Sequence, residues 1–257
     1  MPQLKEFTLA GGVLYGPVRS RRLGASLGIN ILPFNRKICS FNCGYCQCGW
    51  TETGALRGVD FLDPEAIRQE LAAHLRRASS EGVSYDSLTL AGNGEPTLHP
   101  RFPHVVELIV RARDEWMPSA RVSILSNSAS VDDPSVRRGL DLLDERIMKL
   151  DAGSGAKIGE INMPVASFSL EKVVAGLKLI KDVVLQSMFV DGETSNSGNE
   201  DVRDWIDVVG TIAPRFVQIY TLDRVPADRR LLPVEKGRLR EIADRLRRET
   251  GVVGEVF

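Results

Sequence analysis

The chain alternates between short apolar runs and longer segments in which apolar residues recur every three or four positions. The short β-rich runs predict strands at residues 26–32, 87–92, 121–126, 146–151, 182–190 and 215–222. The longer segments predict helices at about residues 64–80, 103–116, 134–143, 169–181, 200–212 and 234–249. Each predicted strand is therefore followed by a predicted helix.

This strand–helix alternation predicts parallel strands joined by right-handed helical crossovers. Such a sheet forms either an open doubly wound sheet or a barrel. Six repeats are fewer than a complete eight-fold barrel requires, so we expect an α/β fold in the form of a partial (β/α)6 TIM-type barrel with parallel strands. In both architectures ligands bind at the carboxyl ends of the strands, where functional side chains should therefore gather.

Composition and charge narrow the classes of protein. The formal net charge is −1, so no bulk positive field indicates a nucleic-acid partner. No apolar run approaches the roughly 20 residues needed to span a bilayer. The opening segment, MPQLKEFTLAGG, lacks the apolar core of a signal peptide. We therefore expect a cytoplasmic protein without a membrane partner, in which thiols stay reduced.

The four cysteines all lie in the segment CSFNCGYCQC, residues 39–48. Cys39, Cys43 and Cys46 have the spacing C-x3-C-x2-C and follow the first predicted strand. Thiolates are soft ligands that hold iron–sulfur clusters, and three on one tight loop leave the fourth iron of a four-iron cluster open to an external ligand. The alternative is a zinc ion bound by these three residues and Cys48, although structural zinc usually takes two separated pairs of ligands. Cys48 has no place in the three-cysteine pattern and is expected to be an incidental small residue near the cluster.

The loop resembles the hallmark of the radical S-adenosylmethionine (SAM) superfamily, in which an aromatic residue, here Tyr45, precedes the third cysteine. The resemblance implies a [4Fe-4S] cluster whose open iron binds SAM. It also implies reductive cleavage of SAM to a 5′-deoxyadenosyl radical, which abstracts hydrogen from a substrate. An electron donor such as a flavodoxin or ferredoxin is then an expected partner.

Further segments are similar to the wyosine-synthase-like branch of iron–sulfur oxidoreductases within that superfamily. They are GPVRSRRLGASLGINILP, KICSFNCGYCQ, GNGEPTLHP, KLDAG, INMP, QSMFVDG and VQIYTLDRVPA. This resemblance implies one radical SAM domain over residues 1–257, with its core at about 12–250 and a partial (β/α)6 barrel fold. Wyosine synthase carries a second cluster, for which only Cys48 remains here, so its specific activity on transfer RNA does not carry over.

Polar residues follow the second, third and fourth predicted strands, at the edge where the cysteine loop is expected. The segment GNGEP resembles the superfamily's Gly-Gly-Glu segment, which recognises the amino group of SAM; a plain turn is the alternative. The segments LSNS and KLDAG carry groups that suit a ribose and a methionine carboxylate. The candidate SAM contacts are Gly92, Asn93, Gly94, Glu95, Ser126, Asn127, Lys149, Asp151 and Gln186.

Lys149 and Tyr220 are the candidate catalytic residues. A lysine near the end of a strand needs a partner when it is buried, and Asp151 lies on the same face, so a structural ion pair is the alternative. Gln218 and Tyr220 share one face of the last predicted strand by alternation. Together with Gln186 they predict a pocket that is lined by polar side chains and contacts the substrate.

The densest basic cluster near this predicted site is Arg19, Arg21 and Arg22, with Arg36 and Lys37 beyond the strand. Guanidinium groups bind phosphate or carboxylate oxygens bidentately, so a substrate that carries such a group is one interpretation, and a solvated basic loop is the other. The substrate itself, transfer RNA or a small metabolite, does not follow from the sequence. A zinc-stabilised nucleic-acid-binding module, a glycyl-radical activase and a SAM-binding protein without cleavage activity remain alternatives.

Overall fold

The structure is a computed structural model that describes residues 9–257. Most of the opening segment MPQLKEFTLAGG, which is expected not to be a signal peptide, lies outside the described residues, because these begin at residue 9. None of the helices in the described part of the chain has the length and apolar character needed to cross a membrane.

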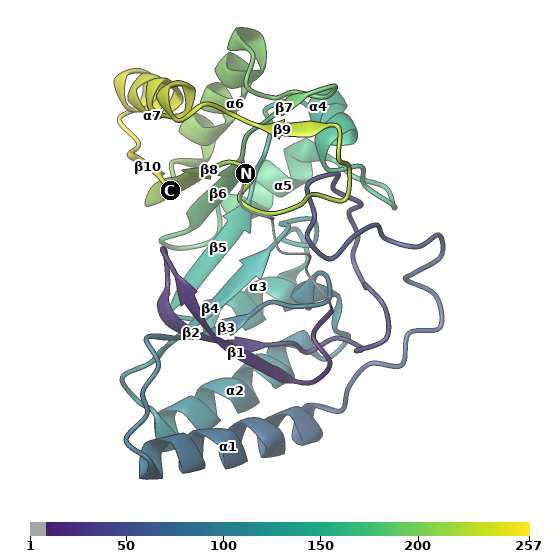
Figure 1. Ribbon diagram of the computed structural model, residues 1–257, viewed down its shortest axis with the longest axis vertical. Coiled ribbons are helices and arrows are strands. Elements are labelled where there is room, and N and C mark those ends of the chain that lie inside the picture. The colour runs from purple at the N-terminus through teal and green to yellow at the C-terminus, as the bar shows by residue number, and fades with distance from the viewer. Residues whose placement is uncertain (1–8) are drawn as a thin grey trace.

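An eight-stranded sheet forms the centre of the molecule, in the order β1-β2-β3-β4-β5-β6-β8-β10 (Figure 1). Its strands are β1 (Leu14–Ser20), β2 (Gly24–Ile29), β3 (Ser87–Leu90), β4 (Arg121–Ser126), β5 (Glu145–Lys149), β6 (Val184–Met188), β8 (Phe216–Tyr220) and β10 (Gly254–Val256). Every neighbouring pair from β2 to β8 is parallel, and these six strands follow one another in chain order. The predicted partial barrel of six βα units is therefore confirmed.

Helices connect these strands, as the apolar periodicity predicted. They are α1 (Pro64–Ser80), α2 (Phe102–Trp116), α3 (Pro134–Asp141), α4 (Gly155–Ile161), α5 (Leu170–Leu177), α6 (Asn199–Ile212) and α7 (Lys236–Thr250). The side chains of Asp63 and Asp133 accept hydrogen bonds from the first backbone N–H groups of α1 and α3, and each precedes a proline at the first helical position. The short helix α4 was not predicted, because seven residues are too few to show a helical period.

The apolar core fixes the strand ends that carry functional side chains. Trp205 of α6 is fully buried, and its indole N–H donates to the backbone oxygen of Leu150, 3.1 Å away. Ser187 of β6 donates to the same oxygen at 2.6 Å. The segment that follows β5 is thus held in place by core contacts, which is what positions Lys149 and Asp151 on either side of Leu150.

Four strands were missed by the sequence patterns. β1 pairs with β2 in an antiparallel hairpin and contains glycine and proline, which fit an edge strand better than the interior of a sheet. β7 (Val190–Gly192), β9 (Leu231–Pro233) and β10 are three residues long each, too short for an alternating pattern. β7 and β9 form a separate two-stranded antiparallel sheet.

Candidate functional site

The cysteine loop and the GNGE segment are tied together by their backbones. The N–H of Ile38 donates to the oxygen of Asn93 at 2.8 Å, and the N–H of Glu95 donates back to the oxygen of Ile38 at 2.9 Å. Gly94 has a φ of +140°, and a Cβ atom there would lie 1.8 Å from the oxygen of Ile38. The glycine is therefore required by the close approach of the chain to itself.

The three cysteines of the predicted cluster site lie in this loop. Cys39 and Cys43 are buried, and Cys46 is partly buried. The side-chain amides of Asn127 and Asn162 point N–H groups at two of the sulfurs, 3.6 Å from Sγ of Cys39 and 3.4 Å from Sγ of Cys43. Burial raises the pKa of the free Cys39 thiol to about 12 and that of Cys43 to about 11. Soft, reduced sulfur ligands with amide donors behind them fit an iron–sulfur cluster.

The arrangement of these thiols bears on the zinc alternative. Within residues 9–257, no three cysteine, histidine, aspartate or glutamate side chains converge closely enough to hold one metal ion. A zinc ion requires its ligands to converge on a single point, whereas a four-iron cluster places each thiolate on a different iron. Cys48 is partly buried beside Cys46, and its thiol donates to the backbone oxygen of Gly92 at 3.4 Å. The [4Fe-4S] cluster therefore stays a prediction for these thiols, and a four-cysteine zinc site stays its alternative.

Glu95 joins the ends of two neighbouring strands. Its carboxylate accepts hydrogen bonds from the hydroxyl of Ser126 at 2.9 Å and from the backbone N–H of Asn127 at 2.6 Å. It also accepts from the backbone and hydroxyl of Thr97, at 3.0 and 2.7 Å. Burial raises the pKa of Glu95, although these donors oppose the shift. The structure therefore brings three of the candidate SAM contacts into one cluster beside the cysteines.

Asn93 differs from its neighbours in the same segment. Its side chain is fully buried, accepts from the N–H of Ala10 at 2.7 Å and donates to the oxygens of Ala10 and Pro33, both at 3.0 Å. The amide is thus occupied in fastening the segment before β1. The backbone of Asn93 is paired as well, because its N–H donates to the side chain of Asn30 at 3.1 Å and its oxygen accepts from Ile38 at 2.8 Å.

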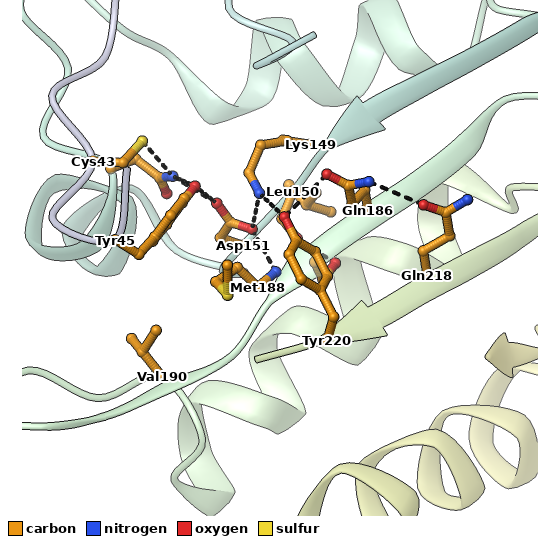
Figure 2. Close-up of polar contacts among 12 residues, drawn as sticks. Cys43, Tyr45, Lys149, Leu150, Asp151, Gln186, Met188, Val190, Gln218 and Tyr220 are labelled. Carbon is orange, nitrogen blue, oxygen red and sulfur yellow. Dashed lines mark hydrogen bonds and ion pairs between the residues drawn. The ribbon is translucent and has the colours of Figure 1, made fainter. Parts of the chain in front are cut away.

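Asp151 is the centre of a second cluster, shown in Figure 2. Its carboxylate accepts from the phenol of Tyr45, from the amide of Asn162 at 2.7 Å and from the backbone N–H of Met188 at 2.8 Å. The ammonium group of Lys149 lies 3.3 Å from Oδ1 of Asp151, the same oxygen that accepts from Met188. The predicted ion pair between Lys149 and Asp151 is therefore present, and four groups from separate elements meet at this carboxylate.

A chain of polar side chains runs from Asp151 across the strand ends (Figure 2). Lys149 donates to the hydroxyl of Tyr220 at 2.7 Å, Tyr220 donates to Gln186 at 3.0 Å, and Gln186 donates to Gln218 at 3.0 Å. Burial disfavours the charge on Lys149, but the carboxylate of Asp151 and the hydroxyl of Tyr220 outweigh it and raise the lysine pKa. Lys149 is consequently a cation in this site, which suits it to bind negative charge better than to act as a base.

The basic residues named from the sequence separate into two groups. Arg19, Arg21 and Arg22 line a pocket with Tyr45 and Tyr220. Arg36 instead donates to the backbone oxygens at 57 and 58, at 3.3 and 3.1 Å. Lys37 is buried under the cysteine loop and donates to the oxygen at 49, at 2.8 Å. The five residues therefore do not line one pocket, because Arg36 and Lys37 bind backbone oxygens between residues 49 and 58.

Two buried asparagines that contact this site were not among the candidate residues from the sequence. Asn162 lies within the INMP segment, just after the unpredicted helix α4, and its Oδ1 atom is buried without a hydrogen-bond partner among the described residues. Asn196 lies in the polar stretch at residues 192–199, is buried, and donates to the oxygens of Asp151 and Met188 at 2.7 and 2.8 Å. Asn162 lies in a segment quoted for the family resemblance, whereas the only sequence signal of Asn196 is an amide within a short polar stretch, which does not distinguish it from a surface residue.

Comparison with known proteins places these features in context. No family model matches the chain. A UPF0026 protein of Synechocystis sp. is 31% identical over 212 residues, which cover 80% of this chain and 74% of the relative. A UPF0026 protein of Methanocaldococcus jannaschii is 34% identical over 170 residues, which cover 66% of this chain and 50% of the relative. The chain spans only 30% of the length of a further relative, a Brachyspira hyodysenteriae protein named GTPase Obg, at 31% identity over 82% of this chain.

Solved structures share the fold. A radical SAM methyltransferase from Sphaerobacter thermophilus superposes with a TM-score of 0.63 and 13% identity, over 90% of this chain and 65% of the other. A structure of TYW1 with a lysine–pyruvate adduct bound superposes with a TM-score of 0.62 and 15% identity, over 88% of this chain and 74% of the other. At these identities the likeness concerns the fold, which is that of radical SAM enzymes as predicted. The wyosine-synthase-like branch stays a prediction.

Proposed function

We propose that this chain, which belongs to the UPF0026 family and has the fold of radical SAM enzymes, is itself a radical SAM enzyme. Cys39, Cys43 and Cys46 would hold three irons of a [4Fe-4S] cluster, with SAM on the fourth. The reaction would be reductive cleavage of SAM followed by removal of hydrogen from a substrate. One observation carries the proposal: three reduced thiols with amide N–H donors lie at the carboxyl ends of the strands, beside two clusters of polar side chains.

The cluster and SAM, when bound, supply the one-electron chemistry, and the protein supplies binding, orientation and exclusion of water. Glu95, Ser126 and Asn127 would contact SAM on the side of β3 and β4. Asp151 and Gln186 would contact it on the side of β5 and β6. The free Oδ1 atom of Asn162 supports this assignment, because a buried acceptor without a donor is costly and a bound ligand would provide one.

Lys149 and Tyr220 are proposed to act on the substrate. The two side chains are hydrogen-bonded, and the rings of Tyr45 and Tyr220 lie 4.8 and 5.1 Å from the lysine ammonium group. Tyr220 also lines the pocket that opens beside the cysteine loop. The pair would therefore hold negative charge on the substrate, with Tyr220 in direct contact.

The extent of the domain, its compartment and its electron donor are also part of the proposed function. We assign residues 1–257 to one radical SAM domain with its core at about 12–250, working in the cytoplasm with an electron donor such as a flavodoxin or ferredoxin. The substrate is transfer RNA or a small metabolite. Because the chain spans 30% and 50% of two of its relatives, the activity of the longer proteins is no guide to the substrate here.

The proposal is tested by anaerobic purification and reconstitution. The protein should be brown, contain iron and sulfide, and form 5′-deoxyadenosine when dithionite and SAM are added. A colourless protein that holds one zinc ion would overturn the proposal in favour of a zinc site. A normal cluster without any 5′-deoxyadenosine would indicate a member of the family that binds SAM and does not cleave it.

A further inference from the structure

A basic pocket is lined by residues of the β1–β2 hairpin and by residues at and after the carboxyl end of β8. The turn of the hairpin reaches β8 through an ion pair of 3.0 Å between Arg21 and Asp223. The pocket has a volume of about 200 Å³. Its charged side chains are four arginines, at 19, 21, 22 and 224, and a single carboxylate, Asp223. The pocket is therefore strongly positive although the whole chain is close to neutral.

Two of these four arginines already have hydrogen-bond partners. Arg21 is paired with Asp223, and Arg224 donates to the side-chain oxygen of Gln47 at 3.2 Å. Arg22 differs, because its Nη1 atom is buried and has no hydrogen-bond partner among residues 9–257. Buried guanidinium donors are nearly always satisfied, since leaving one unpaired is costly. Arg22 thus lines the pocket and keeps one guanidinium donor that no described residue satisfies.

Arg22 is also held in a fixed orientation. Its guanidinium lies over the ring of Tyr220, 4.8 Å from the ring centroid. A stacked guanidinium is preorganised, so little side-chain entropy is lost when it forms a bidentate bond to an oxyanion. Tyr220 in turn accepts a hydrogen bond from Lys149. The guanidinium group of Arg22 is therefore oriented over the ring of Tyr220, and a second cation, the ammonium group of Lys149, is bonded to the hydroxyl of the same residue.

The pocket adjoins the proposed reaction site. Tyr45, one of its lining residues, directly precedes Cys46 and donates to Asp151. Met188, also in the lining, donates its backbone N–H to Asp151. A ligand anchored on Arg22 would therefore lie beside the cysteine loop, where a substrate has to be.

We propose that Arg22, supported by Arg19, binds the phosphate or carboxylate group of a small anionic substrate. The identity of the ligand as substrate rests on the proposed function, whereas the binding of an oxyanion does not. A small molecule is favoured over RNA because the arginines surround one cavity and the net charge of −1 provides no wider field for a polyanion. Phosphate and carboxylate share the bidentate geometry that a guanidinium recognises.

The test is calorimetric titration of the anaerobically reconstituted protein with inorganic phosphate, with succinate and with transfer RNA, at constant ionic strength. The variants are Arg22→Gln, Arg22→Lys and Arg240→Gln, the last an exposed arginine of α7 outside the pocket. Circular dichroism and the melting temperature verify that each variant is folded. Phosphate or succinate should bind, with a Kd that rises about tenfold or more in Arg22→Gln, less in Arg22→Lys, and stays unchanged in Arg240→Gln.

Phosphate and succinate distinguish a phosphate-bearing from a carboxylate-bearing substrate. Only the anion that the pocket prefers should bind with a Kd that rises in Arg22→Gln. Absence of binding for both, or an equal loss in Arg22→Gln and Arg240→Gln, would overturn the proposal. So would tight binding of transfer RNA that depends on Arg22 while both small anions fail to bind. Formation of 5′-deoxyadenosine is measured separately, so that Arg22-dependent binding without SAM cleavage would retain the anion site and reject the radical reaction.

Discussion

The phenol of Tyr45 donates a hydrogen bond to the carboxylate of Asp151, although 106 positions separate the two residues in the sequence. Tyr45 belongs to the cysteine loop after β2, and Asp151 follows β5. Asn162 donates to both groups, at 2.9 and 2.7 Å. The aromatic residue before the third cysteine therefore fastens the cysteine loop to the opposite part of the sheet.

Asp151→Asn should destabilise the protein more than Tyr45→Phe. Tyr45→Phe removes one donor and leaves Asp151 with Lys149, Asn162 and Met188, so we expect a loss of about 1.5 kcal/mol. Asp151→Asn removes the counter-charge of Lys149, and a buried charge without its partner costs about 3 kcal/mol. The measurement is the free energy of unfolding in urea under anaerobic conditions. Equal losses for the two variants would show that the ammonium group finds another partner.

The contribution of Lys149 to stability should not change between pH 7 and about pH 9.5. Its pKa is raised in the folded protein, so its stabilising effect is complete below the unfolded pKa of about 10.4 and is lost only as the pH rises through the folded value. The difference in unfolding free energy between the wild type and Lys149→Met, about 3 kcal/mol, should therefore stay constant over this range. A difference that shrinks below pH 9 would mean that Lys149 loses its proton in the folded state. Lys178→Met, on the surface after α5, is the control.

The fold was predictable where its residues carry a period. The six parallel strands and the helices between them other than α4 are long enough to show alternation or helical spacing, and Asp63 and Asp133 mark two helix starts. β7, β9 and β10 were not predictable, because three residues in a strand carry no period. Their pairing is decided by tertiary contacts, such as the hydrogen bond between the backbones of Phe257 and Ile219 at 3.0 Å.

The sequence placed the candidate site at the carboxyl ends of the strands, but it did not predict how the side chains there are arranged. The rule that ligands bind at the carboxyl edge led to Glu95, Ser126, Asn127 and Asp151, which the structure places in two clusters beside the cysteines. The direction of each side chain was not predictable. Asn93 lies in the right segment, yet its amide points into the protein, because that direction depends on the position of Ala10, far away in the sequence.

Cys48→Ser should retain the iron and sulfide of the reconstituted protein, whereas Cys43→Ser should lose them. The thiol of Cys48 already donates to the oxygen of Gly92, and the proposed cluster takes its three ligands from Cys39, Cys43 and Cys46. Iron and sulfide content and the visible absorption spectrum measure the outcome. A zinc site with four cysteine ligands makes the opposite prediction, because each serine substitution would then remove a ligand and weaken metal binding to a similar extent.

Gly94→Ala should destabilise the protein by about 3 kcal/mol even when SAM is absent. Its Cβ atom would overlap the backbone oxygen of Ile38 at 1.8 Å, and a φ of +140° is unfavourable for any residue with a side chain. The matched control is Gly159→Ala in α4, where a Cβ atom meets nothing within 4 Å. That substitution should stabilise the protein by up to about 1 kcal/mol, because alanine favours the helix.

The comparison of these two variants decides why the segment carries a glycine at this position. If the close approach of the GNGE segment to Ile38 is the reason, Gly94→Ala lowers the free energy of unfolding in urea whether or not SAM is present. If room for a ligand is the reason, Gly94→Ala leaves stability without SAM unchanged and weakens only SAM binding, which equilibrium dialysis with labelled SAM measures. Because the overlap is with backbone atoms that cannot rotate away, we expect the first result. The second would mean that the cysteine loop and the GNGE segment separate more easily than their two hydrogen bonds, at 2.8 and 2.9 Å, indicate.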